Sequence, residues 1–166
     1  MSEYKNNMKK ITKKKKGFLL IEVIVGVSIL AFCLLGIISV GQGFVRLSFQ
    51  SFQGSQTNFL LEEGAEVVRA FRDVDWGNIS GLTVGTKYYL TYSGGKWATS
   101  TTASKIDNIF TRYFTVSNVN RDNTTADIVT SGGTLDTGTR KIQIDVTWQT
   151  SMGMATRTAM LYVTDI

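Results

Sequence analysis

The longest apolar run in the chain lies close to its N-terminus. Residues 18–40 read FLLIEVIVGVSILAFCLLGIISV, in which Glu22 is the single charged side chain. As an α-helix, this run would be about 34 Å long, enough to cross the roughly 30 Å of hydrocarbon in a bilayer. The pattern therefore predicts a transmembrane segment at residues 18–40.

Helix-compatible sequence continues beyond the transmembrane segment. The chain contains no proline, a residue that kinks or breaks the interior of a helix. Four apolar positions recur at the spacing of one helical face: Leu61, Ala65, Val68 and Phe71. We therefore predict one helix from about Phe18 to about Asp73, on the order of 80 Å long, and assign residues 18–75 to this region.

After Trp76 the pattern changes to the period of a β-strand. The segments with strand periodicity are 88–92, 110–117, 140–150 and 158–164. In the clearest of them, the apolar side chains that share one face are Ile142, Ile144, Val146 and Trp148. Residues 76–166 should therefore form a small antiparallel sheet with one solvated face, which makes the fold class α+β.

The connections between these strands are less clearly marked. Turns are expected at 93–96 and 151–154, and a polar loop at 98–104. Residues 120–139 are longer than a usual connection, so they form either a functional loop or a short hairpin around 127–130.

The positive charge is concentrated at one end of the chain. The net charge is +5, but residues 1–17 contain seven lysines and one glutamate, whereas the rest contains 11 basic and 12 acidic residues. This distribution disfavours nucleic acid as a partner, because the basic groups do not form a patch on the main body. The lysines directly before the apolar run instead predict a cytoplasmic N-terminus, with everything after residue 40 outside.

Composition excludes several kinds of chemistry. The chain has no histidine and a single cysteine, Cys33, which lies within the apolar run. An intrachain disulfide is therefore impossible, as are histidine-based metal sites and catalytic triads. We expect a protein without enzymatic activity, cofactor or bound metal.

The junction between the lysines and the apolar run carries a processing motif. Its residues are Lys13, Lys14, Lys15, Lys16, Gly17, Phe18 and, at the fifth position after the glycine, Glu22. A carboxylate inside an apolar helix costs about 2.5–3.5 kcal/mol at the bilayer centre and less toward its edge, so such a residue usually marks a partner. A glycine before Phe18 leaves the backbone easily extended for a protease.

This junction resembles the type III signal of type IV prepilins. The resemblance implies that a membrane prepilin peptidase removes the leader, residues 1–17, by cutting after Gly17 and then methylates the amino group of Phe18. It also implies that Glu22 pairs with the amino terminus of a neighbouring subunit during assembly. The fold expected on this basis is the type IV pilin fold, and the expected partners are other pilin subunits, the peptidase, the pilus assembly platform and, before assembly, membrane lipid.

A second similarity supports the first. Residues 60–73, followed by Trp76, resemble the end of the long helix in PilV-type minor pilins, and Val146-Thr147-Trp148 resembles a late strand of those proteins.

Two features depart from common pilin patterns. Ser39 stands where many pilins have a helix-kinking proline, and the C-terminal disulfide of many pilins cannot form here.

Three functions remain open from the sequence. The first is a structural subunit of a type IV pilus, which would begin in the inner membrane as a single-pass protein and end in an extracellular or periplasmic filament. The second is a pseudopilin of a type II secretion or competence (DNA-uptake) system. The third is a membrane-anchored ligand-binding module in which Glu22 is incidental. A secretory signal peptide fits poorly, because its apolar core would be shorter and followed by a small-residue cleavage site.

Overall fold

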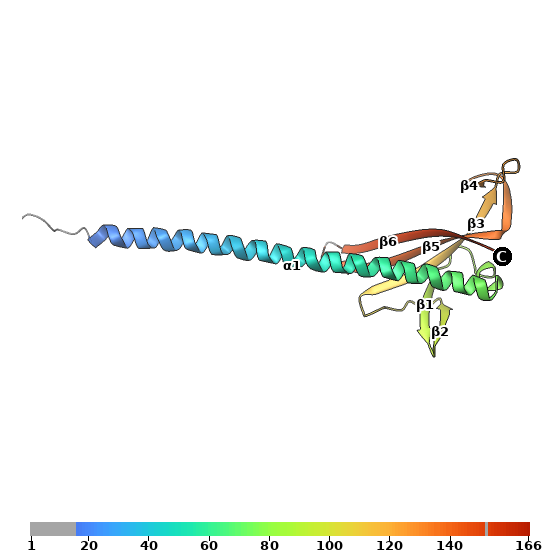
Figure 1. Cartoon of the computed structure of the whole chain (residues 1–166), viewed down its shortest axis with the longest axis horizontal. Helices are drawn as coiled ribbons and strands as arrows, with labels where there is room; N and C mark the ends of the chain where they lie inside the picture. The colour runs from blue at the N-terminus through green and yellow to red at the C-terminus, as the bar shows by residue number, and fades with distance from the viewer. Residues whose placement is uncertain (1–15, 152) are drawn as a thin grey trace, which may run out of the picture. The chain divides into compact units, whose positions relative to one another are not determined.

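The computed structural model describes the backbone of residues 16–151 and 153–166, and the side chains from Leu20 onward except that of residue 152 (Figure 1). The predictions for Lys13, Lys14 and Lys15 lie outside the described residues. The chain divides into two compact units, Met1–Gln50 and Ser51–Ile166, and each is described by itself.

The described part of the first unit is a single helical segment. It belongs to α1 (Lys16–Val74), which begins two residues before the predicted start at Phe18. The apolar side chains of this segment are exposed, and two polar ones bond to the helix itself. The hydroxyl of Ser28 donates to the carbonyl of Ile24 at 2.7 Å, and that of Ser39 donates to the carbonyl of Leu35 at 2.8 Å. These bonds satisfy the serine hydroxyls inside an apolar run.

The second unit contains the rest of α1, which packs on a β-sheet. Leu61 and Val68 are buried on this part of the helix, as its spacing predicted. The helix ends at Val74, one residue beyond the predicted end. A short helix that the sequence did not reveal, α2 (Gly77–Ser80), follows directly. Its first backbone N–H, at Gly77, donates to the Asp75 carboxylate at 2.7 Å.

The sheet is antiparallel throughout and has the order β2-β1-β3-β5-β6, with β4 paired to β3 (Figure 1). Its strands are β1 (Tyr88–Ser93), β2 (Lys96–Ser100), β3 (Phe110–Arg121), β4 (Ile128–Val129), β5 (Thr134–Thr150) and β6 (Gly153–Thr164). The predicted α+β class is confirmed: a long apolar N-terminal helix is packed, through its C-terminal part, on a six-stranded antiparallel sheet.

The β1–β2 hairpin confirms one predicted turn and corrects one predicted loop. Gly94 and Gly95 connect the strands with φ of 59° and 78°, the left-handed pair that a two-residue hairpin turn requires. Residues 98–100, predicted as part of a polar loop, instead form the end of β2. The prediction was wrong because β2 is an exposed edge strand, so its threonines and serines show no apolar alternation.

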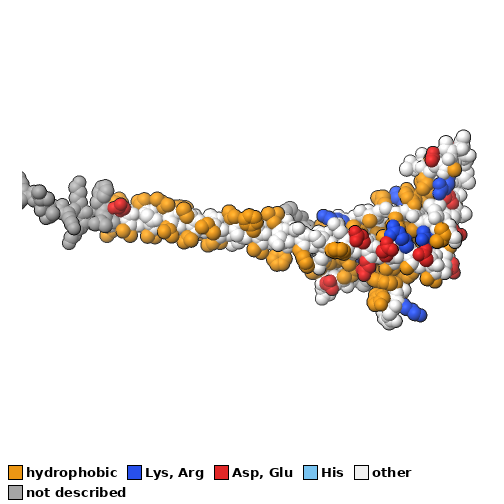
Figure 2. Space-filling model, in the orientation of Figure 1, with side chains coloured by type: hydrophobic (Ala, Val, Ile, Leu, Met, Phe, Trp, Pro, Cys, Tyr) orange, Lys and Arg blue, Asp and Glu red, His pale blue; other side chains and the backbone are white. Residues whose placement is uncertain are grey.

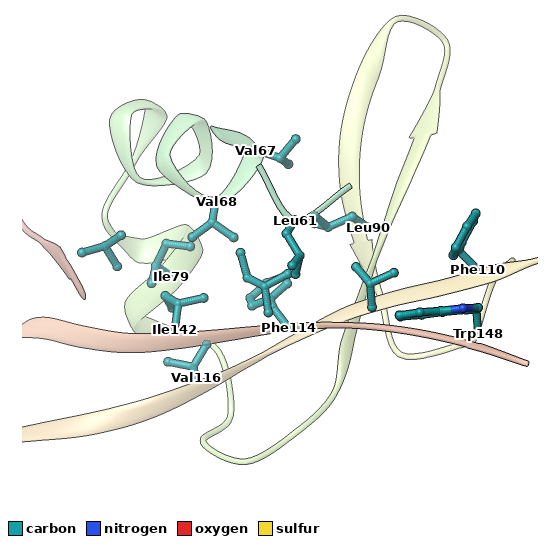
Figure 3. Packing of buried hydrophobic residues seen from close by; sticks show 13 residues of the cluster. Leu61, Val67, Val68, Ile79, Leu90, Phe110, Phe114, Val116, Ile142 and Trp148 are labelled. Atoms are coloured by element: carbon teal, nitrogen blue, oxygen red, sulfur yellow. The ribbon is translucent and has the colours of Figure 1, made fainter. Parts of the chain in front are cut away.

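The core lies between α1 and one face of the sheet (Figure 3). Ile142, Ile144 and Val146 of β5 are completely buried and Trp148 nearly so, as predicted. Figure 3 shows Leu61 and Val68 pointing from the helix toward Phe114 and Ile142 on the strands. Phe114 lies opposite Ile144 in the β3–β5 register, and its ring centroid is 5.7 Å from that of Tyr88.

The opposite face of the sheet is less solvated than predicted. Asp145 points away from the core residues beside it in sequence, yet it is only 5% exposed. Its carboxylate accepts hydrogen bonds from the Gln143 amide at 3.0 Å and the Thr158 hydroxyl at 2.5 Å. The predicted solvated face is therefore interrupted at this position, where Gln143 on the same strand and Thr158 on β6 donate to a buried carboxylate.

Residues 120–139 form an extension of the sheet. The β3–β5 register shifts between Asn118 and Val119, and β4 then returns along β3 with Asn120 opposite Val129. The hairpin alternative for this region is therefore confirmed, and β5 begins six residues earlier than predicted. An ion pair joins the two long strands within the extension, because Arg121 Nε lies 2.6 Å from Asp136 Oδ2.

We expect this extension to loosen in acid. Hydrogen bonds from Thr139 and Arg121 lower the pKa of Asp136 below its ordinary value of 3.8, and the backbone N–H groups of Thr125 and Thr124 lower the pKa of Asp122. Because both folded pKa values are depressed, the stabilisation is fully present above about pH 4 and is lost as the pH falls through the folded values. Amide-exchange protection at 120–136 should therefore stay constant down to about pH 4 and fall as the pH is lowered further.

The matched variant is Asp136→Asn at neutral pH. The substitution removes the charge that pairs with Arg121. It should therefore lower amide-exchange protection a few-fold in residues 120–136 and leave the protection of the centre of β3 and β5 unchanged. Equal acid sensitivity of both regions would contradict the assignment to these two carboxylates.

Candidate functional site

The N-terminal part of α1 is the first candidate site. Among the described residues, one helix is long and apolar enough to cross a membrane, and none of its most apolar window is buried. A core helix of a soluble protein would be mostly buried, so that explanation does not fit. Figure 2 shows apolar side chains along this exposed part of the helix. By its length, composition and exposure, this helix is compatible with the transmembrane segment predicted at 18–40.

Glu22 lies within this apolar surface. Its side chain is exposed, and within the part of the chain that the structure describes it has no hydrogen-bond or ion-pair partner. It follows Phe18 by four residues on the same helix, a rise of about 6 Å, so the two positions lie on one face. A carboxylate so placed can accept a cation, because its cost in an apolar medium falls when it is paired.

The predicted cleavage position lies at the beginning of α1. Lys16, Gly17 and Phe18 are in the first turn of the helix, although their side chains are outside the described residues. The first four N–H groups of a helix have no intrahelical carbonyl partner, so this turn opens more easily than the interior. The structure thus brings Gly17, Phe18 and Glu22 together within two turns of one helix.

Arg112 forms a second candidate site, which sequence reasoning missed. It lies on β3, and its side chain is only 2% exposed. Nη1 donates to the backbone carbonyl of Leu60 at 3.0 Å and to Glu63 Oε2 at 2.5 Å, both on α1. The guanidinium carbon lies 5.3 Å from the centroid of the Trp97 ring. This arginine therefore links the sheet to the helix, and its Nε has no hydrogen-bond partner among the described residues.

A cavity of about 370 Å³ lies beside this arginine. Its lining residues are Glu63, Leu90, Thr91, Tyr92, Trp97, Ser104, Lys105, Ile106 and Arg112. The rings of Tyr92 and Trp97 pack against each other with centroids 5.0 Å apart. The cavity therefore combines an apolar lining with two basic side chains and one acidic side chain.

The sequence did contain a signal that Arg112 is buried and paired. The alternation of β3 places Phe110, Arg112, Phe114 and Val116 on the same face. A charged residue in an otherwise apolar face is expected to have a specific partner when buried. The partner itself, Glu63, lies 49 positions away, so only the fold identifies it.

Within the described ranges, no group of three histidine, cysteine, aspartate or glutamate side chains is arranged to hold a metal ion. The chain matches no protein-family model, no curated protein and no solved structure. A functional assignment therefore depends on the N-terminal motif and on the geometry of the two sites.

Proposed function

We propose that this protein is a type IV pilin-like filament subunit with the type IV pilin fold. It is made as a prepilin in the cytoplasmic membrane, cleaved after Gly17, methylated at Phe18 and assembled through Glu22. In this proposal it is a structural protein without enzymatic activity. Its partners are other pilin subunits, a prepilin peptidase and the assembly platform of a pilus or related filament.

One observation carries the proposal. The basic run that ends at Gly17 leads directly into an exposed apolar helix that contains one carboxylate, and the C-terminal part of that same helix packs on an antiparallel sheet. A simple membrane anchor needs the apolar residues but not the glycine–phenylalanine junction or Glu22. A filament subunit needs all of these features.

The leader prepares the processing step. Its lysines hold the N-terminus at the cytoplasmic headgroups, where a membrane peptidase can reach Gly17. Hydrolysis of the Gly17–Phe18 peptide bond consumes one water molecule and releases a leader carboxylate and a new Phe18 ammonium. Methylation of this amine keeps it basic, so the mature chain starts with a positive charge at the edge of the apolar segment.

Glu22 then provides the partner for assembly. In the membrane its carboxylate has a free-energy cost, and the Phe18 ammonium of a neighbouring subunit can offset that cost by pairing with it. The remaining apolar residues exchange contacts with lipid for contacts with adjacent helices. The sheet unit, Ser51–Ile166, remains outside the membrane and carries the surface of the filament.

The direct test is mass spectrometry of the native protein. Intact mass and N-terminal peptides would be measured separately on sheared cell-surface material and on membranes. We expect a chain that starts at N-methylated Phe18 in both fractions. The matched variant Gly17→Leu should block cleavage and leave the full-length chain in the membrane, because a bulky side chain replaces the residue that precedes the cut.

The alternatives give different results. A processed chain that is absent from sheared material would favour a pseudopilin of a type II secretion or competence system. A chain that still carries its leader and is found only in membranes would contradict the proposal. It would favour a membrane-anchored binding module.

A further inference from the structure

We infer that the cavity beside Arg112 is a binding site for a small carboxylate that carries an apolar body. This inference does not depend on the filament proposal, because the cavity lies wholly within the sheet unit. No described residue of the chain fills it, and it lies at the junction of α1, the β1–β2 hairpin and the segment before β3.

The first argument is the unused hydrogen-bonding capacity of Arg112. A guanidinium has five N–H donors in a planar fork that matches a carboxylate. The two bonds to α1 both use Nη1, and the buried Nε has no partner among the described residues. A purely structural link would leave a buried donor unsatisfied, which costs free energy. Arg112 lines the cavity but is only 2% exposed, so a ligand carboxylate would reach the free side of the fork once the exposed Glu63 side chain turns aside.

The second argument is how firmly Arg112 is held. Its guanidinium lies over the Trp97 ring, and Trp97 in turn packs against Tyr92. The bond to the Leu60 carbonyl fixes one end of the fork. Little side-chain entropy remains to be lost when an anion binds, so the site is preorganised.

The third argument is the chemistry of the walls. Leu90 and Ile106 provide aliphatic surface, and Tyr92 and Trp97 provide aromatic surface. The exposed Lys105 adds a second cation at the rim, so the lining carries one more positive than negative charge. The volume of about 370 Å³ falls within the range of small-molecule sites in proteins. A small organic anion matches this combination better than a neutral compound or a bare inorganic ion.

Glu63 limits the affinity of the site. Its carboxylate occupies Nη1 of Arg112 and would repel an incoming anion, but its side chain is 47% exposed and can turn toward solvent. Replacing it by the isosteric amide should keep an acceptor beside the guanidinium and remove the repulsion. We therefore expect Glu63→Gln to bind the anion more tightly, a gain that misfolding cannot produce.

The experiment is calorimetric titration of the full chain in detergent with three matched probes. Phenylacetate has the carboxylate and the ring, phenylacetamide has the ring without the charge, and acetate has the charge without the ring. Saturable binding of phenylacetate should exceed that of either other probe by about tenfold, because the site uses both features. A tripeptide that ends in phenylalanine, compared with its C-terminal amide, then distinguishes a peptide end from a free carboxylate as the natural source.

Single substitutions in the cavity lining test which residues bind phenylacetate. Glu63→Gln should strengthen phenylacetate binding about tenfold, equivalent to about 1.4 kcal/mol, and leave phenylacetamide binding unchanged. Lys105→Gln should weaken phenylacetate binding about threefold, as expected for an exposed charge. Tyr92→Ala should weaken phenylacetate binding roughly tenfold, because an aromatic contact with the probe is lost. The matched controls are Lys96→Gln on the same hairpin and Tyr162→Ala on β6, neither of which lines the cavity and both of which should bind like the parent.

Several outcomes would overturn the inference. Equal binding of phenylacetamide would mean an apolar cleft without anion recognition, and equal binding of acetate or competition by inorganic phosphate would mean a general anion site. The absence of saturable phenylacetate binding to both the parent and Glu63→Gln would mean that Arg112 only links the sheet to the helix.

Discussion

Glu22→Ala should insert into the membrane and be processed at Gly17 but fail to enter filaments. The alanine removes the carboxylate that would pair with the Phe18 ammonium of a neighbouring subunit. An unpaired charge in an apolar interior costs several kcal/mol, and each 1.4 kcal/mol changes an equilibrium about tenfold. We therefore expect the amount of this protein in sheared surface material to fall by more than about tenfold.

The same substitution should not harm the membrane-bound state. A charged side chain is unfavourable in hydrocarbon, so its removal should make insertion at least as favourable as in the parent. Quantitative mass spectrometry of both fractions would measure the two effects together. We expect the processed Glu22→Ala chain to accumulate in membranes while it disappears from the sheared material.

Glu62→Ala is the matched control. Glu62 is also an exposed glutamate on α1, but it lies in the second unit, outside the apolar segment. Its removal should leave incorporation near the parental level. Normal incorporation of Glu22→Ala, or equal loss with both variants, would refute the role proposed for Glu22. Failure of Glu22→Ala to be processed would place the glutamate in peptidase recognition instead.

Local patterns in the sequence predicted most of the fold. The apolar face of the second half of α1 and the inward face of β5 each depend on a single period, which the sequence displays directly. The Gly94-Gly95 turn is also local, because it depends on the backbone freedom of two residues. These features could therefore be predicted without knowledge of the tertiary structure.

The features that the sequence did not reveal depend on contacts that its periodicity does not encode, some of them local and others between distant segments. Residues 98–100 have no apolar alternation, and they form a strand because β1 provides a hydrogen-bonding edge. Asp145 is buried because Gln143 and Thr158 provide donors. The Arg112–Glu63 pair and its cavity require three segments to meet. The N-terminal motif is the reverse case, because its residues lie close together in the sequence and need no tertiary contact to be recognised.

Gly64 is a position where the contact between helix and sheet leaves no room for a side chain. An added Cβ would lie 3.2 Å from Ile144 Cγ2 and 3.3 Å from Arg112 Cδ, both closer than ordinary van der Waals contact. Ile144 is completely buried, and Arg112 is held by its bond to the Leu60 carbonyl and by its packing over Trp97. Neither neighbour can move away easily, so the absence of a side chain at residue 64 sets how closely the helix approaches the sheet.

Gly64→Leu should therefore destabilise the sheet unit by about 2–3 kcal/mol, because an overpacked core forces its neighbours out of their preferred rotamers. Urea denaturation of the full chain in detergent, followed by tryptophan fluorescence, would report the change. Gly54→Ala is the control on the same helix, where an added Cβ meets Arg157 Nη2 only at 3.5 Å. Gly54→Ala should stabilise the sheet unit by about 0.5–1 kcal/mol, because alanine has a higher helix propensity than glycine. If Gly64→Leu were as stable as the parent, the close packing of α1 on β3 and β5 at this point would be wrong.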